Sequence, residues 1–385
     1  MTATCMAAEF RAWATIDLQA LRANLALARA QNPDCSVVAV VKANGYGHGI
    51  VPVAKALQDQ LRAGDCFGVA SIEEAQTLRS AGITEPVLLL EGFVTSGELA
   101  EVAQQGFQCV LHSPYQLDAM LALFASGKSI EPLTVWLKID TGMHRLGLSP
   151  AEFVTAWNAL KSHSGIRKLI VMSHFACADD PQSPATERQV ALLHETLAAA
   201  NVPLATTELS LAASAAILIW PQTHYQWFRP GIMLYGGAPI MGENGIDRGL
   251  RPVMTLRSRL MAIKTVAAGE AVGYGASYIC EREQRIGIVS IGYGDGYPRR
   301  APSGTPVLIN SRHDGRIVQQ RTGLAGRVSM DMIIVDLSEC EHAAVGDEVI
   351  LWGEGLPADE IARRCGTLAY ELFCQVTPRV HFQYV

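Results

Sequence analysis

The chain has 385 residues, of which 49% are hydrophobic and 18% charged, and its formal net charge is -6. This length exceeds the usual size of one domain, so two domains are expected. The acidic balance gives no reason to expect nucleic acid or an anionic membrane as a partner, and no apolar stretch reaches the length of a membrane span.

Two further exclusions concern the compartment. The first residues, MTATCMAAEFRAW, lack the basic and apolar regions of a secretory signal. The nine cysteines are scattered, without CxxC pairs or metal-ligand spacing. Such usage is typical of reduced thiols in a cytoplasm rather than of a disulfide framework or a zinc site, so we expect a cytoplasmic protein without a metal.

Strand-like and helix-like patterns then alternate along the chain. Helical patterns include residues 19–31, as well as 71–82 and 149–163, which both begin with a serine cap. The strand-like runs are 37–43, 67–70, 86–90, 107–112, 134–140, 169–174, 208–213 and 228–235. Eight strands alternating with helices predict a (β/α)8 TIM barrel, and a doubly wound open sheet is the alternative.

From residue 241 onward the pattern changes to short β-rich runs, such as GEAVGYGASYI and GRVSMDMIIVDL. Only PADEIARRCG has a helical pattern there, and MGENGID is a plausible junction. We therefore expect a barrel over residues 12–240 and a mostly β C-terminal domain over 241–385.

Polar residues gather where the barrel strands end, which is where such barrels carry their active sites. Lys42 ends the first strand, in VVKANGYGHG, and Tyr46 follows in its loop. Arg145 follows the fifth strand, His174 ends the sixth, Ser214 follows the seventh, and Arg229 lies in the eighth. A solvated lysine before a flexible turn is the alternative for the first segment taken alone.

The loops after strands seven and eight are the usual phosphate site of a TIM barrel, and Ser214 and the amides around Gly231 are suitable donors. The sequence has neither GxGxxG nor a Walker loop. A phosphate site facing a strand-end lysine suggests pyridoxal 5'-phosphate (PLP), whose aldehyde forms a Schiff base with lysine. Arg229 could then face the pyridine nitrogen.

Seven motifs, in order along nearly the whole chain, resemble the alanine racemase family: VVKANGYGHG, DTGMHRLG, SHF, RPGIMLYG, GYGASY, IGYGDGYPR and GRVSMDM. The resemblance implies a PLP-dependent barrel with a C-terminal β domain, a homodimer, and the interconversion of L- and D-alanine. It assigns Lys42 as the residue that holds PLP and as one of two bases. Tyr274, supplied by the partner subunit, is implied as the second base, acting on the opposite face of the α-carbon.

The residues alone do not distinguish Tyr274 from Tyr293 as that base; the motif favours Tyr274, and Tyr293 resembles the family's residue at the active-site entrance. A neutral phenol is a poor base, so nearby cations must help it ionise. The resemblance assigns the PLP phosphate to Tyr46, Ser214, Gly231 and Ile232.

By the same resemblance Arg229 faces the pyridine nitrogen and His174 orients it, where a salt-bridged arginine and a core histidine are the structural alternatives. Arg145 and the Met330 amide would bind the substrate carboxylate. Lys138 matches a lysine that is carbamylated in many family members, although a buried, salt-bridged lysine is the alternative. Asp331 follows Met330 in the motif and receives no role.

Two positions depart from the family pattern. Ala213 stands where many members have asparagine, and Pro378 stands where many have a tyrosine near the phosphate. A roomier pocket would accept serine or larger amino acids, so a racemase of broader specificity is one alternative. A PLP-binding homeostasis protein and an amino-acid decarboxylase of related fold are the others.

Overall fold

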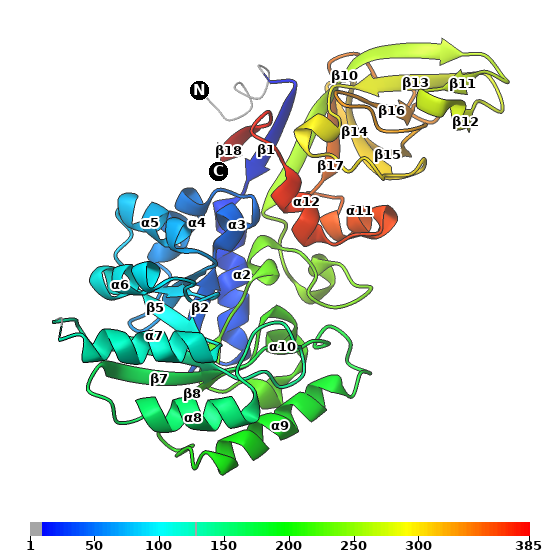
Figure 1. Cartoon of the computed structure of the whole chain (residues 1–385). Helices are drawn as coiled ribbons and strands as arrows, with labels where there is room; N and C mark the ends of the chain where they lie inside the picture. The colour runs from blue at the N-terminus through cyan, green and yellow to red at the C-terminus, as the bar shows by residue number, and fades with distance from the viewer. Residues whose placement is uncertain (1–9, 128) are drawn as a thin grey trace. The chain divides into compact units, whose positions relative to one another are not determined.

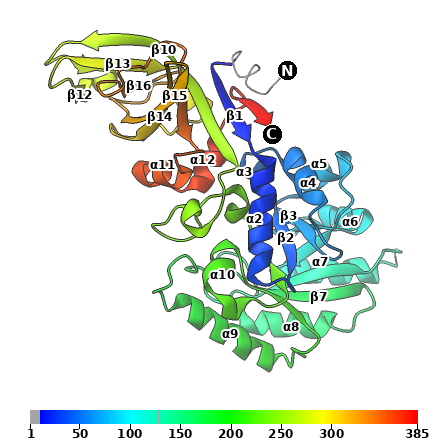
Figure 2. The same cartoon turned by 180° about the vertical axis from the view of Figure 1, so that it is seen from behind.

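The computed structural model describes residues 10–127 and 129–385, shown from opposite sides in Figures 1 and 2. These residues form two compact units. The barrel unit comprises Arg22–Leu234 and Pro239–Gly242; the β unit comprises residues up to Leu21, Tyr235–Ala238 and Glu243–Val385. Residues 1–9, where we expect no secretory signal, lie outside the described residues.

Within its described residues, the barrel unit contains one eight-stranded sheet, and every strand pair in it is parallel. In sheet order the strands are β8 (Glu208–Ser210), β7 (Ile166–Met172), β6 (Leu133–Lys138), β5 (Gln108–Leu111), β4 (Val87–Leu89), β3 (Cys66–Val69), β2 (Ser36–Val40) and β9 (Trp227–Phe228). The two ends meet through a parallel bridge between Ala213 and Arg229. The Arg229 N–H also donates to the Ala212 carbonyl at 2.9 Å. The predicted barrel is confirmed, and an open sheet is excluded.

Helices lie outside these strands (Figure 1). Ser71 and Ser149 cap the helices that follow them, as predicted, and Ser149 forms a full capping box with Glu152. The helices are α2 (Leu18–Gln31), α3 (Lys42–Tyr46), α4 (Ile50–Gln58), α5 (Ile72–Ser80), α6 (Ser96–Gln105), α7 (Pro114–Ala125), α8 (Pro150–Leu160), α9 (Ala185–Ala199) and α10 (Ser214–Ile219). Short 3-10 turns are η2 (Pro221–Thr223), η3 (Ile232–Tyr235) and η4 (Gly245–Arg248).

Most barrel strands are shorter than predicted, and two of the differences fall on site residues. The run 37–43 ends as a strand at Val40, because the backbone turns left-handed from Ala43 onward. The run 228–235 contributes only Trp227–Phe228 to β9, and η3 follows it. Pro230 has no N–H for a ladder, although its carbonyl still accepts from Val40 at 3.1 Å. Lys42 and Arg229 therefore follow their strands rather than lying within them. His174 also follows its strand, because β7 ends at Met172.

The β unit has one eight-stranded sheet and one hairpin within its described residues. The sheet strands are β1 (Ala12–Ile16), β10 (Met254–Val266), β13 (Gln284–Val289), β14 (Pro306–His313), β15 (Arg316–Gly323), β16 (Ile333–Asp336), β17 (Glu348–Trp352) and β18 (His381–Tyr384). The hairpin joins β11 (Ala271–Val272) to β12 (Tyr278–Ile279) through η5 (Tyr274–Ala276), and η6 (Tyr293–Asp295) follows β13. The helices are α11 (Ala358–Cys365) and α12 (Ala369–Gln375).

The N-terminal strand differs from the expected domain division. β1 pairs with β10 in antiparallel and with β18 in parallel orientation, so residues 12–21 lie with the β unit rather than with the barrel. Both partners are far away in sequence, which explains why local patterns do not reveal the pairing. The β unit also has a second helix, α12, beyond the single helix expected.

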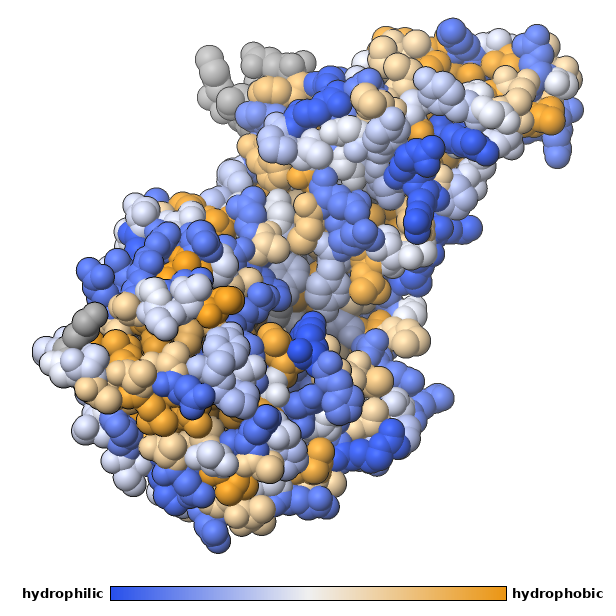
Figure 3. All heavy atoms as spheres, viewed as in Figure 1, coloured by the Kyte–Doolittle hydropathy of each residue, from blue (hydrophilic) through white to orange (hydrophobic). Residues whose placement is uncertain are grey.

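The exposed surface is mixed in character. On the face seen in Figure 3, hydrophobic residues are interspersed with hydrophilic ones over both units. Among the described residues, no helix combines the length and the apolar character needed to cross a membrane.

Candidate active site

Lys42 begins an unusual turn. The four residues Ala43 to Tyr46 all have φ between 50° and 62°, in the left-handed region. The turn is closed by hydrogen bonds from the Gly45 N–H to Val41 O (2.8 Å) and from the Gly47 N–H to Ala43 O (2.9 Å). A left-handed conformation costs about 1–2 kcal/mol at each residue that is not glycine, and such strain gathers at functional sites.

Glu74 and His48 fix this turn. The Glu74 carboxylate accepts from the Ala43 N–H at 2.6 Å and from the Ala70 N–H at 2.8 Å, which ties the ends of β2 and β3 together. The His48 Nδ1 donates to the Tyr46 carbonyl at 2.8 Å. Burial lowers the pKa of His48 to about 4, so the ring is neutral at physiological pH. Sequence reasoning missed both: Glu74 has the pattern of an ordinary helix N-terminus.

The residues predicted to hold a phosphate converge at the end of β9. The Ser214 Oγ accepts from the Gly231 N–H at 2.9 Å and from the Met233 N–H at 3.4 Å. A Cβ atom at Gly231 would lie 2.7 Å from the Tyr46 hydroxyl oxygen, so any larger residue would displace that hydroxyl. Ile232, which begins η3, is fully buried. Hydroxyls and backbone N–H groups on neighbouring loops are the donor set that a phosphate requires.

Arg229 is buried beneath these loops. Its Nη1 donates to Ser210 O at 2.7 Å and to Ser210 Oγ at 2.6 Å, and its Nη2 donates to Ser173 O at 2.7 Å. Its Nη2 also contacts the Nδ1 of His174 at 3.3 Å and Leu211 O at 3.2 Å. Burial lowers the pKa of Arg229 to about 10, which still leaves the guanidinium charged at neutral pH.

Several cations act on one another in this site. Burial lowers the pKa of Lys138 to about 8, with further lowering by Arg229, Arg145 and Lys42. Burial also lowers the pKa of His174 well below its ordinary value, and the same four cations add to the effect. Lys42, Lys138, Arg145, His174 and Arg229 therefore lie within one electrostatic site at the carboxyl ends of the strands.

Arg145 is exposed, on a loop that Asp140 organises. The Asp140 Oδ1 accepts from the Gly142 N–H at 2.9 Å and from the His144 N–H at 3.1 Å. The loop closes on itself through a parallel bridge between Ile139 and Leu148. Arg145 therefore lies at the tip of a loop held by hydrogen bonds to Asp140, with its side chain exposed to solvent.

A buried polar network supports the loops after β6 and β7. Thr141 Oγ1 and Ser173 Oγ are 2.8 Å apart, and the Gln189 Nε2 donates to Thr141 Oγ1 at 3.1 Å and to His174 O at 3.0 Å. Gln189 belongs to α9, so this helix holds both loops in place. No sequence pattern indicates this role, because Gln189 resembles an ordinary helix residue.

The remaining predicted site residues belong to the β unit. Tyr274 lies in the turn between β11 and β12, and 70% of its surface is exposed. Tyr293, Met330 and Asp331 come together on two neighbouring loops: the Tyr293 N–H donates to Ser329 O at 3.0 Å, and the Gly294 N–H donates to Met330 O at 2.8 Å. Tyr274 is on a separate hairpin, where a Cβ at Gly275 would lie 3.0 Å from the Arg327 Nη1.

Comparison with known proteins covers almost the entire chain. The family model "Alanine racemase, N-terminal domain" matches residues 16–239, and "Alanine racemase, C-terminal domain" matches residues 253–384. The chain is 49% identical to "Alanine racemase, biosynthetic" of Pseudomonas aeruginosa over 372 residues, covering 96% of this chain and 98% of that protein. It is 46% identical to the Escherichia coli protein of the same description, again over 372 residues, with 96% and 98% coverage.

Solved structures of alanine racemases also superpose on nearly the whole chain. The crystal structure of biosynthetic alanine racemase from Pseudomonas aeruginosa superposes with a TM-score of 0.89 at 47% identity, covering 97% of this chain and 99% of that one. Alanine racemase from Bartonella henselae, crystallised with covalently bound pyridoxal phosphate, superposes with a TM-score of 0.85 at 29% identity, covering 98% and 100%.

Proposed function

The chain belongs to the alanine racemase family, and we propose that it interconverts L- and D-alanine with PLP held on Lys42 and with Lys42 and Tyr274 as the two bases. The observation that carries the proposal is the site at the carboxyl ends of the barrel strands. Lys42, the buried Arg229 and the Ser214–Gly231–Tyr46 cluster converge there, in a chain that matches this family over nearly its full length.

The residues present fit PLP. Because Gly231 has no Cβ, the Tyr46 hydroxyl lies against its backbone, so Tyr46, Ser214 and the backbone at Ile232 are grouped where they could contact one phosphate. Among the described residues, none of the hydrogen bonds of Arg229 comes from its Nε, which would therefore face the pyridine nitrogen. When bound, PLP withdraws electrons from the α-carbon of an amino acid and so acidifies its α-hydrogen. The charged Arg229 would keep the pyridine nitrogen unprotonated, which restrains that withdrawal.

Racemisation requires a proton donor and a proton acceptor on opposite faces of the α-carbon. The neutral amine of Lys42 would take the α-proton on one face, and the hydroxyl of Tyr274 would deliver a proton on the other. In the reverse direction the two residues exchange roles. One residue acting alone would mostly return the proton to the face it came from, so both are needed.

Substrate orientation is assigned to cations and to a backbone donor. Arg145, exposed at the tip of its loop, would pair with the alanine carboxylate through a charge-assisted fork. The Met330 amide would donate to the same carboxylate. Lys138, whose pKa is lowered to about 8, has a neutral fraction able to form a carbamate, and this would place a negative charge beside Arg145.

We also propose a cytoplasmic homodimer in which Tyr274 completes the site of the partner subunit. The exposure of Tyr274 supports this arrangement, because its own unit leaves most of the residue uncovered. Buried free thiols such as Cys66, Cys109 and Cys280 are compatible with a reducing compartment.

The alternatives are not favoured. A PLP-binding homeostasis protein would resemble the barrel alone, yet the C-terminal family model matches residues 253–384. A decarboxylase of related fold is not favoured because the curated relatives at 46–49% identity are described as alanine racemases. Broader specificity is tested by comparing kcat/KM among amino acids.

The test is a racemisation assay combined with chemical trapping. The purified protein should convert L-alanine to a mixture of enantiomers, measured by chiral chromatography. Borohydride should fix the cofactor to Lys42, as located by peptide mapping, and Lys42→Ala should lose the label. Lys55→Ala, which removes an exposed lysine on α4, is the control and should keep it. A label on another residue, or no racemisation, would overturn the assignment.

A further inference from the structure

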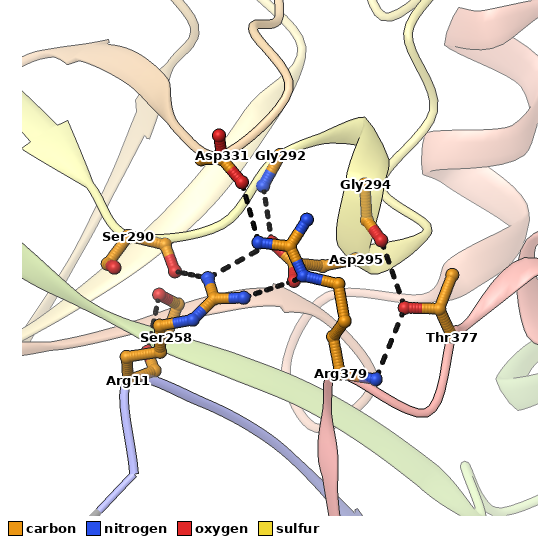
Figure 4. Close-up of polar contacts among 9 residues, drawn as sticks. All are labelled: Arg11, Ser258, Ser290, Gly292, Gly294, Asp295, Asp331, Thr377 and Arg379. Atoms are coloured by element: carbon orange, nitrogen blue, oxygen red, sulfur yellow. Dashed lines mark hydrogen bonds and ion pairs between the residues drawn. The ribbon is translucent and has the colours of Figure 1, made fainter.

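A buried carboxylate lies beneath the loops that carry Tyr293 and Met330. Asp295 has no exposed surface, and its Oδ2 accepts from the Gly292 N–H at 3.0 Å and from the Arg11 Nη1 at 3.1 Å. The Nε of Arg379 lies 3.2 Å from its Oδ1 (Figure 4). A buried charge is costly unless it is paired, so this site is built around two arginines.

Arg379 also reaches a second carboxylate. Its Nη2 donates to Asp331 Oδ1 at 2.6 Å, so one guanidinium joins the η6 loop to the loop between β15 and β16 (Figure 4). The base of Arg379 is fixed as well. The neighbouring Thr377 N–H donates to Asp295 O at 3.1 Å, and the Thr377 hydroxyl donates to Gly294 O at 3.0 Å.

These contacts hold the η6 loop and the β15–β16 loop close together in a fixed arrangement. A Cβ at Gly292 would overlap the carbonyls of Ser329 and Met330, and a Cβ at Gly294 would overlap the Arg379 guanidinium. The loops therefore approach as closely as only glycine permits at these two positions. Asp331 is tied to Arg379 at the same place where the Met330 carbonyl is tied to the Gly294 N–H.

This arrangement of the two loops fixes the direction in which the Met330 N–H points. Ser329 O and the Met330 N–H belong to the same planar trans peptide, so they point in opposite directions. The Tyr293 N–H holds Ser329 O from one side, which turns the Met330 N–H away from the η6 loop. Within the described chain, this N–H donates to no protein acceptor, so it is available to a ligand.

We propose that Arg379 is a positioning residue for substrate binding: by bridging Asp295 and Asp331 it holds the Met330 N–H in the direction from which it binds the carboxylate of alanine. This inference rests on the proposed function, in which Met330 contributes that contact. It also gives Asp331 a role, because Asp331 anchors the peptide that follows Met330.

The experiment compares Asp331→Asn, Arg379→Met and the double variant in the full-length holoenzyme. Asp331→Asn is the cleaner variant, because it leaves every partner of the buried Asp295 in place. Both single variants should raise the KM for alanine about tenfold while kcat changes less than about threefold, which is the pattern of a lost binding contact. The double variant should be no worse than Arg379→Met, because the two residues act as one pair.

Two further measurements separate positioning from folding. Propionate, which has the methyl and carboxylate of alanine but no amino group, should bind about tenfold more weakly to each variant by calorimetry, whereas the Tm of Asp331→Asn should be unchanged. Arg282→Met is the matched control, since Arg282 forms an exposed ion pair with Glu339 in the same unit. Unchanged KM and propionate affinity in both variants, in an active wild-type enzyme, would overturn this inference alone. An inactive wild-type protein would overturn the proposed function with it.

Discussion

The Nη2 of Arg229 donates a hydrogen bond to the Nδ1 of His174 over 3.3 Å. A guanidinium has no acceptor, so His174 must present a lone pair at Nδ1 and carry its proton on Nε2. Burial, with Arg229 and the other cations, holds the pKa of His174 well below its ordinary value, so the neutral ring can accept this bond. His174 therefore helps to orient the Arg229 guanidinium, in addition to the carbonyls of Ser173 and Ser210 that accept its other hydrogen bonds.

Replacing His174 with leucine removes this acceptor and lets Arg229 shift. We expect His174→Leu to lower kcat for alanine about 10- to 100-fold, since a small misplacement near reacting atoms has an effect of this size. The absorption spectrum of the bound cofactor should change as well. His194→Leu, on the exposed side of α9, is the control. An unaltered kcat and spectrum in His174→Leu would show that the bond has no orienting role.

Lys138 is expected to react with carbon dioxide. With its pKa lowered to about 8, roughly a tenth of its amine is neutral at pH 7. The ammonium would first lose a proton, and the neutral amine nitrogen would then bond to the carbon of carbon dioxide and release a second proton, which replaces a cation by an anion beside Arg145. Protein prepared in 13C-bicarbonate should show a carbamate carbon signal by NMR that is missing in Lys138→Gln. The same signal in both proteins would assign it elsewhere.

Much of the barrel could be predicted from the sequence, because its signals are local. Alternating strand and helix patterns, with serine caps such as Ser71 and Ser149, are set by residues a few positions apart. The resemblance to known motifs then named the site residues. The pairing of β1 with β10 and β18 could not be predicted, because it joins segments more than 200 residues apart and depends on the whole sheet.

The turn after Lys42 illustrates what else local patterns omit. Its glycines indicated a bend, but the left-handed φ of Ala43, Asn44 and Tyr46 is held by distant partners. Glu74, on α5, is one of these partners, and its contact with the Ala43 N–H arises only when β2 and β3 lie side by side. The same reason hides Gln189, and the Arg379 bridge between Asp295 and Asp331.

His48 should make the protein sensitive to acid. Its pKa is lowered from 6.5 to about 4 in the folded chain, so below pH 6.5 the unfolded chain takes up a proton that the folded chain does not. The titration of His48 therefore leaves the free energy of unfolding unchanged above that pH. As the pH falls to about 5, it lowers the free energy of unfolding by about 2 kcal/mol. Urea unfolding near pH 7 and pH 5 should therefore show a smaller acid loss in His48→Asn than in wild type. Equal losses would contradict the assignment.

Pro378 should widen the choice of substrate. We expect alanine to have the highest kcat/KM and serine to react measurably, because proline stands where the family resemblance implies a tyrosine. Pro378→Tyr should lower kcat/KM for serine about tenfold relative to alanine. Leu368→Tyr, which adds a tyrosine at another exposed position, should not. If serine or lysine outran alanine in the wild-type enzyme, alanine would not be the preferred substrate.

The shared site makes a prediction about mixed subunits. Lys42→Ala and Tyr274→Phe homodimers should each racemise alanine very poorly, because every site lacks one base. When the two variants are unfolded together and refolded, heterodimers should form in which one site has lost both bases and the other has kept both.

Racemase activity in isolated heterodimers, carrying a different affinity tag on each subunit, tests the two-base account most directly. We predict that activity returns and approaches half of the wild-type value per dimer, because one complete pair of Lys42 and Tyr274 is restored. Verified heterodimers as inactive as the parent variants would contradict a site built from the lysine of one subunit and the tyrosine of the other.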